Sequence, residues 1–143
     1  MKWWPRECRP GDMIRVRIGH VYHHGVFVSE DEVIQFGMPP VNMQQHMQQE
    51  HRVCATDIET FACGSIIEVA EPDRKEAKTR VPAEKAIAAA RARLGEGGYD
   101  IVHNNCEHFA CECCFGRHFS EQSDGFREKW RAMMAAKRGG GAE

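Results

Sequence analysis

One short stretch, residues 104–110, constrains the fold of this chain more than any other. It reads Asn-Asn-Cys-Glu-His-Phe-Ala, and an apolar run continues from it to Phe115. Asn104 or Asn105 is a good N-cap, because a short side-chain amide accepts the backbone N–H groups that a first helical turn leaves unpaired. The pattern therefore predicts a helix that begins at Cys106. Those N–H groups and the helix dipole favour thiolate over thiol, which is the setting of a nucleophile.

A nucleophilic cysteine needs a base, and residues 22–28 contain two histidines in a segment that alternates like a strand. In a strand, His24 faces the same side as Val26, and His23 faces the other side. Either imidazole can approach Cys106, because such partners are adjacent in space and not in sequence. Sequence alternation therefore leaves both histidines as candidates.

Gln35 lies in a second predicted strand, residues 32–36, twelve positions beyond His23. A side-chain amide can orient an imidazole by hydrogen bonding to its second nitrogen, as Asn does in papain-like proteases. Gln35 is therefore a candidate for holding the base in place.

These segments resemble the lecithin retinol acyltransferase (LRAT)-like family. The matching motifs are Pro10-Gly11-Asp12, His23-x-Gly25-Val26-Phe27-Val28 and Asn105-Cys106-Glu107-His108-Phe109, with a tyrosine, Tyr99, shortly before the last of them. The resemblance covers most of the chain, to about residue 120. It implies a circularly permuted relative of the NlpC-type, papain-like cysteine hydrolases, which explains why the histidine precedes the cysteine in the sequence.

The resemblance also assigns roles to individual residues. It implies Cys106 as nucleophile, His23 as general base and Gln35 as the residue that orients His23. Three further residues are expected to support the site: Tyr22, His24 and Asn105. The family usually carries a second histidine where this chain has Gln35. A glutamine can orient the base but carries no charge, so it polarises His23 less than an ionisable partner would.

The chemistry implied by the resemblance is covalent acyl transfer. A thioester would form on Cys106 from a glycerophospholipid or another acyl ester, in an acyltransferase or a phospholipase A-type hydrolase of lipid metabolism. This thiol chemistry requires no cofactor, and we expect none. Two other classes stay open: a thiol peptidase or amidase, and a non-catalytic binding or regulatory domain.

The amino-acid composition indicates the cellular compartment of the protein and the kinds of partner it can have. Four of the seven cysteines crowd residues 106–114, which suits neither a disulfide framework nor the paired C-x-x-C motifs of a structural zinc site. We therefore expect a reduced, cytoplasmic protein without metal. The net charge of -2 offers no field for nucleic acid. No apolar run is long enough for a signal peptide or a transmembrane segment, so contact with lipid would be a transient visit to a membrane surface.

The predicted fold class is α+β, with an antiparallel meander packed against helices. The expected strands are residues 13–18, 22–28, 32–36 and 65–70, and the expected helices are residues 56–61, 83–94, 106–115 and 126–137. Ile87, Ala90 and Leu94 lie at helical spacing and predict a buried face. Residues 42–51 are either an exposed loop or short surface helix, or a flap over the site. In domain terms we expect an N-terminal tail at 1–9, the LRAT-like domain at 10–120, and a C-terminal helix with a flexible tail at 121–143.

Overall fold

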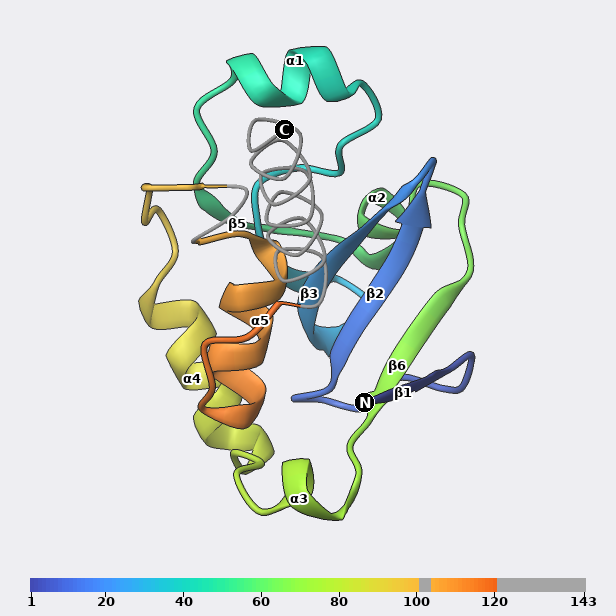
Figure 1. The fold of residues 1–143 in the computed structure, drawn as a ribbon, viewed down its shortest axis with the longest axis vertical. Coiled ribbons are helices and arrows are strands. Elements are labelled where there is room, and N and C mark those ends of the chain that lie inside the picture. The colour runs from blue at the N-terminus through green and yellow to red at the C-terminus, as the bar shows by residue number, and fades with distance from the viewer. Residues whose placement is uncertain (101–103, 121–143) are drawn as a thin grey trace, which may run out of the picture.

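The centre of the fold is a six-stranded antiparallel sheet in the order β1-β6-β2-β3-β4-β5 (Figure 1). The computed structural model describes residues 1–100 and 104–120, without the side chains of Met43 and Met47. The strands are Lys2–Trp4 (β1), Met13–Ile18 (β2), Val21–Ser29 (β3), Glu32–Phe36 (β4), Val53–Thr56 (β5) and Ile67–Glu71 (β6). The helices are Met43–Gln48 (α1), Ile58–Ala62 (α2), Arg74–Ala77 (α3), Ala83–Ala92 (α4) and Cys106–Phe115 (α5). The predicted α+β class is confirmed.

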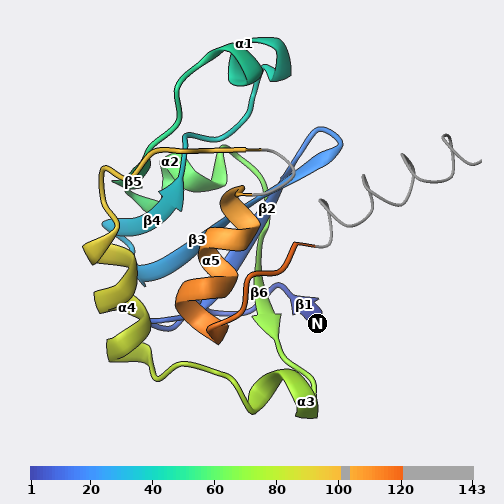
Figure 2. The same ribbon diagram turned by 60° about the vertical axis from the view of Figure 1, so that its left-hand side comes forward.

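The helices lie on both faces of this sheet. Helices α4 and α5 pack on one face, where Ala90 and Phe109 join a cluster with Val26 and Ile34 of the sheet (Figures 1 and 2). Helix α2 covers part of the opposite face through Phe61. Residues of one strand that differ by one position therefore enter two separate apolar clusters, because successive side chains point to opposite faces.

The predicted meander is confirmed as β2, β3 and β4, which pair antiparallel in chain order. The sheet is wider than the sequence indicates. Residues 2–4, part of the expected N-terminal tail, form the edge strand β1, where Lys2 pairs with Glu71 of β6. Strand β5 pairs with β4 at the other edge. Strands of three and four residues are too short to produce a recognisable alternation, so the pattern did not reveal them.

Two helix boundaries differ from the predicted ones. Helix α2 begins after Asp57, whose carboxylate accepts a hydrogen bond of 2.7 Å from the backbone N–H of Thr60, while Thr56 ends strand β5. Helix α4 ends at Ala92, so Leu94 lies beyond it and is 45% exposed. The prediction that Leu94 belongs to the buried face of α4 is wrong.

Small side chains form the true inner face of α4. Ala86 and Ala90 are fully buried, and they allow α4 to approach α5 closely. Arg93, directly after α4, donates to Glu112 of α5 with an N–O distance of 2.6 Å. The pair ties the two helices together at one end.

Residues 42–51 contain a short helix, α1, and not only a loop. Asn42 caps it by accepting a hydrogen bond of 3.1 Å from the backbone N–H of Gln45. The rings of His46 and His51 pack at a tilt of 34° with 4.0 Å between their centroids, and Tyr99 packs against both rings. These aromatic contacts hold α1 against the segment that leads into α5.

Gly25 of β3 is required where α2 packs on the sheet. A Cβ atom at this position would lie 2.8 Å from Cε2 of Phe61 and 3.0 Å from Cγ1 of Val33. We expect Gly25→Ala to lower the free energy of unfolding by about 1–3 kcal/mol through overpacking, measured by urea denaturation. Gly97→Ala is the matched control, because its nearest neighbour would be 3.6 Å away. Equal stability of both variants would contradict this account.

Within residues 1–100 and 104–120, none of the helices has both the length and the apolar character needed to cross a bilayer. The predicted helix at 126–137, with the rest of the predicted C-terminal segment, lies outside the described residues.

Candidate active site

Cys106 is the first residue of helix α5, as predicted. The side-chain oxygen of Asn105 accepts hydrogen bonds of 3.0 Å from the backbone N–H groups of Glu107 and His108. In return, Nδ1 of His108 accepts a hydrogen bond of 3.1 Å from the backbone N–H of Asn105. This is a reciprocal capping box in which a histidine takes the place of the usual glutamate or glutamine. The predicted capping role of Asn105 is confirmed.

Helix α5 lies along β3, and this contact brings His24 to Cys106 (Figures 1 and 2). The distance from Sγ of Cys106 to Nδ1 of His24 is 4.0 Å, at the outer limit for a thiol–imidazole hydrogen bond. Cys106 is 6% exposed and His24 is 1% exposed. His24 shares its face of β3 with Val26, which packs in the same cluster as α5. The thiol and this imidazole form a buried pair.

His23 lies on the opposite face of β3. Its Nε2 is 2.8 Å from Oε1 of Gln35, and its ring packs against Phe61 of α2 with 5.3 Å between centroids. The amide nitrogen of Gln35 donates to Oγ1 of Thr56 at 2.8 Å. The hydrogen bond expected between His23 and Gln35 is therefore present. The structure does not bring this pair to Cys106, because adjacent strand residues point to opposite faces.

Glu107 lies near the second ring nitrogen of His24. Its Oε2 is 3.6 Å from Nε2 of His24. Its Oε1 accepts a hydrogen bond of 2.7 Å from Oγ of Ser120, and that hydroxyl accepts one of 3.2 Å from Nδ2 of Asn105. The sequence motifs assigned no role to Glu107 or to Ser120. No local pattern signals these contacts, because they depend on how the start of α5 crosses β3.

Burial decides the protonation of the central pair. Removal from water raises the pKa of the Cys106 thiol to about 12, although backbone N–H groups, those of His24, Glu107 and Cys106 itself, act in the opposite direction. Burial also lowers the pKa of His24 to about 3, and the positive charge of Arg15 adds to this. At neutral pH both groups are uncharged. The thiolate expected from the helix N-terminus is not favoured, because desolvation outweighs the helix contribution.

The edge strand β1 brings an aromatic ring against the His24 imidazole. The ring of Trp3 meets that of His24 edge-on at 5.5 Å between centroids. The guanidinium carbon of Arg15 lies 4.3 Å from the ring centroid of Trp3 and 3.9 Å from that of Tyr22. Arg15 also pairs with Glu68 at 3.0 Å. Tyr22, predicted as a supporting residue, thus lies against Arg15.

The other cysteines of α5 serve the apolar core. Cys111, Cys113 and Cys114 are buried in the cluster between α5 and the sheet, and burial raises the pKa of each thiol. In the part of the chain that the structure describes, no three His, Cys, Asp or Glu side chains form a group that could hold a metal ion.

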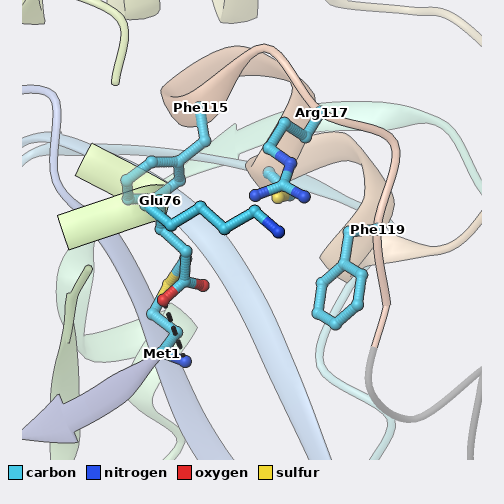
Figure 3. A pocket seen from close by; sticks show the side chains of 7 residues that line it. Met1, Glu76, Phe115, Arg117 and Phe119 are labelled. Atoms are coloured by element: carbon cyan, nitrogen blue, oxygen red, sulfur yellow. Dashed lines mark ion pairs between the residues drawn. The ribbon is translucent and has the colours of Figure 1, made fainter. Parts of the chain in front are cut away.

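Two surface pockets lie beside the elements that carry the site. One of about 200 Å³ lies beside the C-terminal end of α5, where Met1 and Glu76 form an ion pair of 3.1 Å (Figure 3). It is lined by Met1, Lys75, Glu76, Cys111, Phe115, Arg117 and Phe119. The other, of about 400 Å³, lies between residues 38–42 and helices α1 and α2. Neither Cys106 nor His24 lines either of these two pockets.

Comparison with known proteins identifies the family. The family model described as lecithin retinol acyltransferase matches residues 6–119, which include both His24 and Cys106. The lecithin retinol acyltransferase of Bos taurus is 27% identical over 147 aligned residues, which cover 90% of this chain and 64% of that protein. The enzyme of Homo sapiens is 26% identical, with the same coverage of 90% and 64%. The chain thus spans just under two thirds of the length of these curated relatives. Because the family model covers most of the chain, this protein belongs to the lecithin retinol acyltransferase family.

Proposed function

We propose that this protein is a thiol-dependent acyltransferase or phospholipase A-type hydrolase that forms a thioester on Cys106. The observation that carries the proposal is the buried pair of Cys106 and His24, with 4.0 Å between Sγ and Nδ1, at the N-terminus of α5. Membership of a family whose curated relatives are named as acyltransferases supports it. A cysteine beside a base is the arrangement that nucleophilic catalysis requires.

The first half of the reaction transfers the acyl group to the enzyme. Because the thiol and the imidazole are both neutral at rest, Nδ1 of His24 takes the thiol proton as the sulfur attacks the ester carbonyl carbon. A sulfur–carbon bond forms, and the bond between that carbon and the alcohol oxygen breaks. The leaving alcohol receives the proton from His24. The products of this step are a Cys106 thioester and the free alcohol.

The second half returns the enzyme to its starting state. An alcohol, an amine or water attacks the thioester carbon, and His24 takes the proton of the attacking group. The carbon–sulfur bond breaks and the sulfur recovers that proton. In each half the backbone N–H of Cys106, with a neighbouring donor, would hold the developing oxyanion. A single donor of this kind contributes about 3 kcal/mol to the stability of the transition state.

We propose that the substrate is a glycerophospholipid and that the protein binds it at a membrane surface. We also propose that the protein resides in the reducing cytoplasm. All seven cysteines are free, which suits a reducing compartment. Met38 and Val41, beside α1, are 48% and 69% exposed and line the larger pocket. Apolar side chains at the mouth of a pocket suit an acyl chain entering from a bilayer.

Covalent trapping tests this proposal. The protein is incubated with a short-chain phosphatidylcholine, and intact mass spectrometry followed by peptide mapping locates any acyl adduct. We expect one acyl group on the peptide that contains Cys106, and its release by hydroxylamine, as for a thioester. Cys63→Ala serves as the control, because Cys63 is an exposed thiol available for non-specific acylation. An adduct that disappears in Cys63→Ala would contradict the proposal.

A non-catalytic binding role is the second candidate, and the burial of Cys106 favours it. Cys106 is 6% exposed and the pKa of its thiol is raised to about 12, both unfavourable for a reactive nucleophile. In that case the wild-type protein forms no adduct with the ester. An adduct with activated amides but not with esters would instead identify a thiol amidase.

A further inference from the structure

His24 has two ring nitrogens, and only one of them faces the thiol. Nδ1 is the nitrogen near Cys106, so a base at this position needs its lone pair on Nδ1 and its hydrogen on Nε2. Nε2 is buried and has no hydrogen-bond partner among the described residues. A buried N–H without a partner is costly, so the useful tautomer requires an acceptor nearby.

Glu107 is the acceptor within reach. Its Oε2 lies 3.6 Å from Nε2 of His24, so a side-chain movement of about 0.5 Å would complete a hydrogen bond. Glu107 is 4% exposed and its position follows from two buried neighbours, Ser120 and Asn105. The hydroxyl of Ser120 donates to Oε1, which turns Oε2 toward the imidazole. The start of α5 also favours a negative charge.

We propose that Glu107 is the positioning residue of this site: its carboxylate accepts the Nε2–H of His24 and so directs the lone pair of Nδ1 at Cys106. The inference rests on the proposed thiol chemistry and assigns the orienting role to α5 in place of Gln35. Gln35 makes the equivalent contact to His23, on the far side of the sheet. Strand β3 thus carries two imidazoles with separate partners. His24, beside Glu107, is the one that faces the Cys106 thiol.

The charged surroundings of His24 leave Glu107 as the suitable acceptor. Arg15 of β2 pairs across the sheet with His24, and its positive charge disfavours a second cation on the imidazole. The carboxylate of Glu68 is paired with that arginine. His23, the neighbour on β3, and the Cys106 thiol are further titratable groups near the ring. Glu107 is the carboxylate that the structure places 3.6 Å from Nε2 of His24.

Glu107→Gln tests the assignment. The Ser120 hydroxyl needs an acceptor, so it would bind the amide oxygen and leave the amide NH₂ facing Nε2 of His24. That arrangement favours the wrong tautomer, with the hydrogen on Nδ1. We expect the single-turnover acylation rate constant to fall by at least about 10²-fold, with an unchanged substrate concentration for half-maximal rate.

The matched control is Glu112→Gln. Glu112 lies on the same helix and pairs with Arg93, so its loss removes a carboxylate from α5 without touching His24. We expect its acylation rate to stay within about twofold of wild type, because a partly exposed pair contributes little. A drop in Glu112→Gln equal to that in Glu107→Gln would overturn the inference, since it would trace the loss to helix stability.

Nitrogen-15 NMR of the histidine rings gives a readout that does not depend on turnover. Wild-type His24 is expected to carry its hydrogen on Nε2, and Glu107→Gln is expected to move it to Nδ1. Hydrogen on Nδ1 in the wild type would overturn the inference even if the protein is an active acyltransferase. A wild type that forms no thioester, with the hydrogen on Nε2, would instead reject the proposed function and leave the positioning contact standing.

Discussion

Replacing Cys106 by alanine is expected to abolish the acyl adduct, and His24→Gln is expected to slow its formation by about 10²–10⁴-fold. The first variant removes the atom that attacks the ester. The second keeps a side chain of similar size but removes the nitrogen that takes the thiol proton. The loss should be large because burial keeps the thiol protonated at neutral pH, so no reserve of thiolate exists without a base. Single-turnover acylation followed by mass spectrometry measures both effects.

His23→Gln is the matched comparison for His24→Gln. His23 is equally buried and sits next to His24 on β3, but its ring faces Gln35 and Phe61. We expect its loss to reduce stability while the acylation rate of the folded protein changes by less than about tenfold. A full loss of acylation in His23→Gln with an active His24→Gln would assign the base to His23, as the family resemblance implies.

Acidification between pH 6.5 and 5 is expected to destabilise the folded protein strongly. Burial lowers the pKa of His23 to about 4, of His24 to about 3 and of His46 to about 4. In the unfolded chain these groups titrate near 6.5. Below that pH the unfolded state binds more protons, so the stability that is complete above pH 6.5 falls as the pH falls toward 4. Each buried histidine contributes a slope of up to about 1.4 kcal/mol per pH unit.

Urea denaturation at pH 7.5, 6 and 5 measures this slope. Carboxylates such as Glu32, Asp57 and Glu96 contribute little to this slope between pH 7.5 and 5. Their pKa values are lowered from values that are already acidic. His24→Gln should reduce the slope by the contribution of one buried histidine. A free energy of unfolding that stays constant from pH 7.5 to 5 would contradict the buried, neutral histidines of this structure.

Local patterns were sufficient for the elements that carry the site. Alternation of apolar residues predicted β2, β3 and β4, since side chains of a half-buried strand follow a two-residue period. The Asn105 cap and the start of α5 followed from the demands of a helix N-terminus, which involve residues only three positions apart. The motifs around His23 and Cys106 indicated the family that the comparison confirms.

The same patterns could not predict how these elements meet. The strand β5 and the edge strand β1 form because a neighbouring strand offers hydrogen bonds, not because of their own sequence. Which carboxylate lies near the imidazole depends on the crossing of α5 over β3, and Glu107 was therefore missed. The predicted thiolate failed for a related reason, since its pKa depends on the water excluded by distant residues.

The sequence by itself determined that a cysteine opens a helix and that two adjacent histidines lie on one strand, because both features arise from neighbouring residues. Strand alternation left open which histidine faces the thiol, since a two-residue period separates the faces of a strand without saying which face α5 covers, and the family resemblance assigned the base to His23. Only the tertiary structure placed α5 on the face of His24 and Val26, with His23 and Gln35 on the other. The physical reason is that the choice of face is made by long-range apolar packing, which no local pattern encodes.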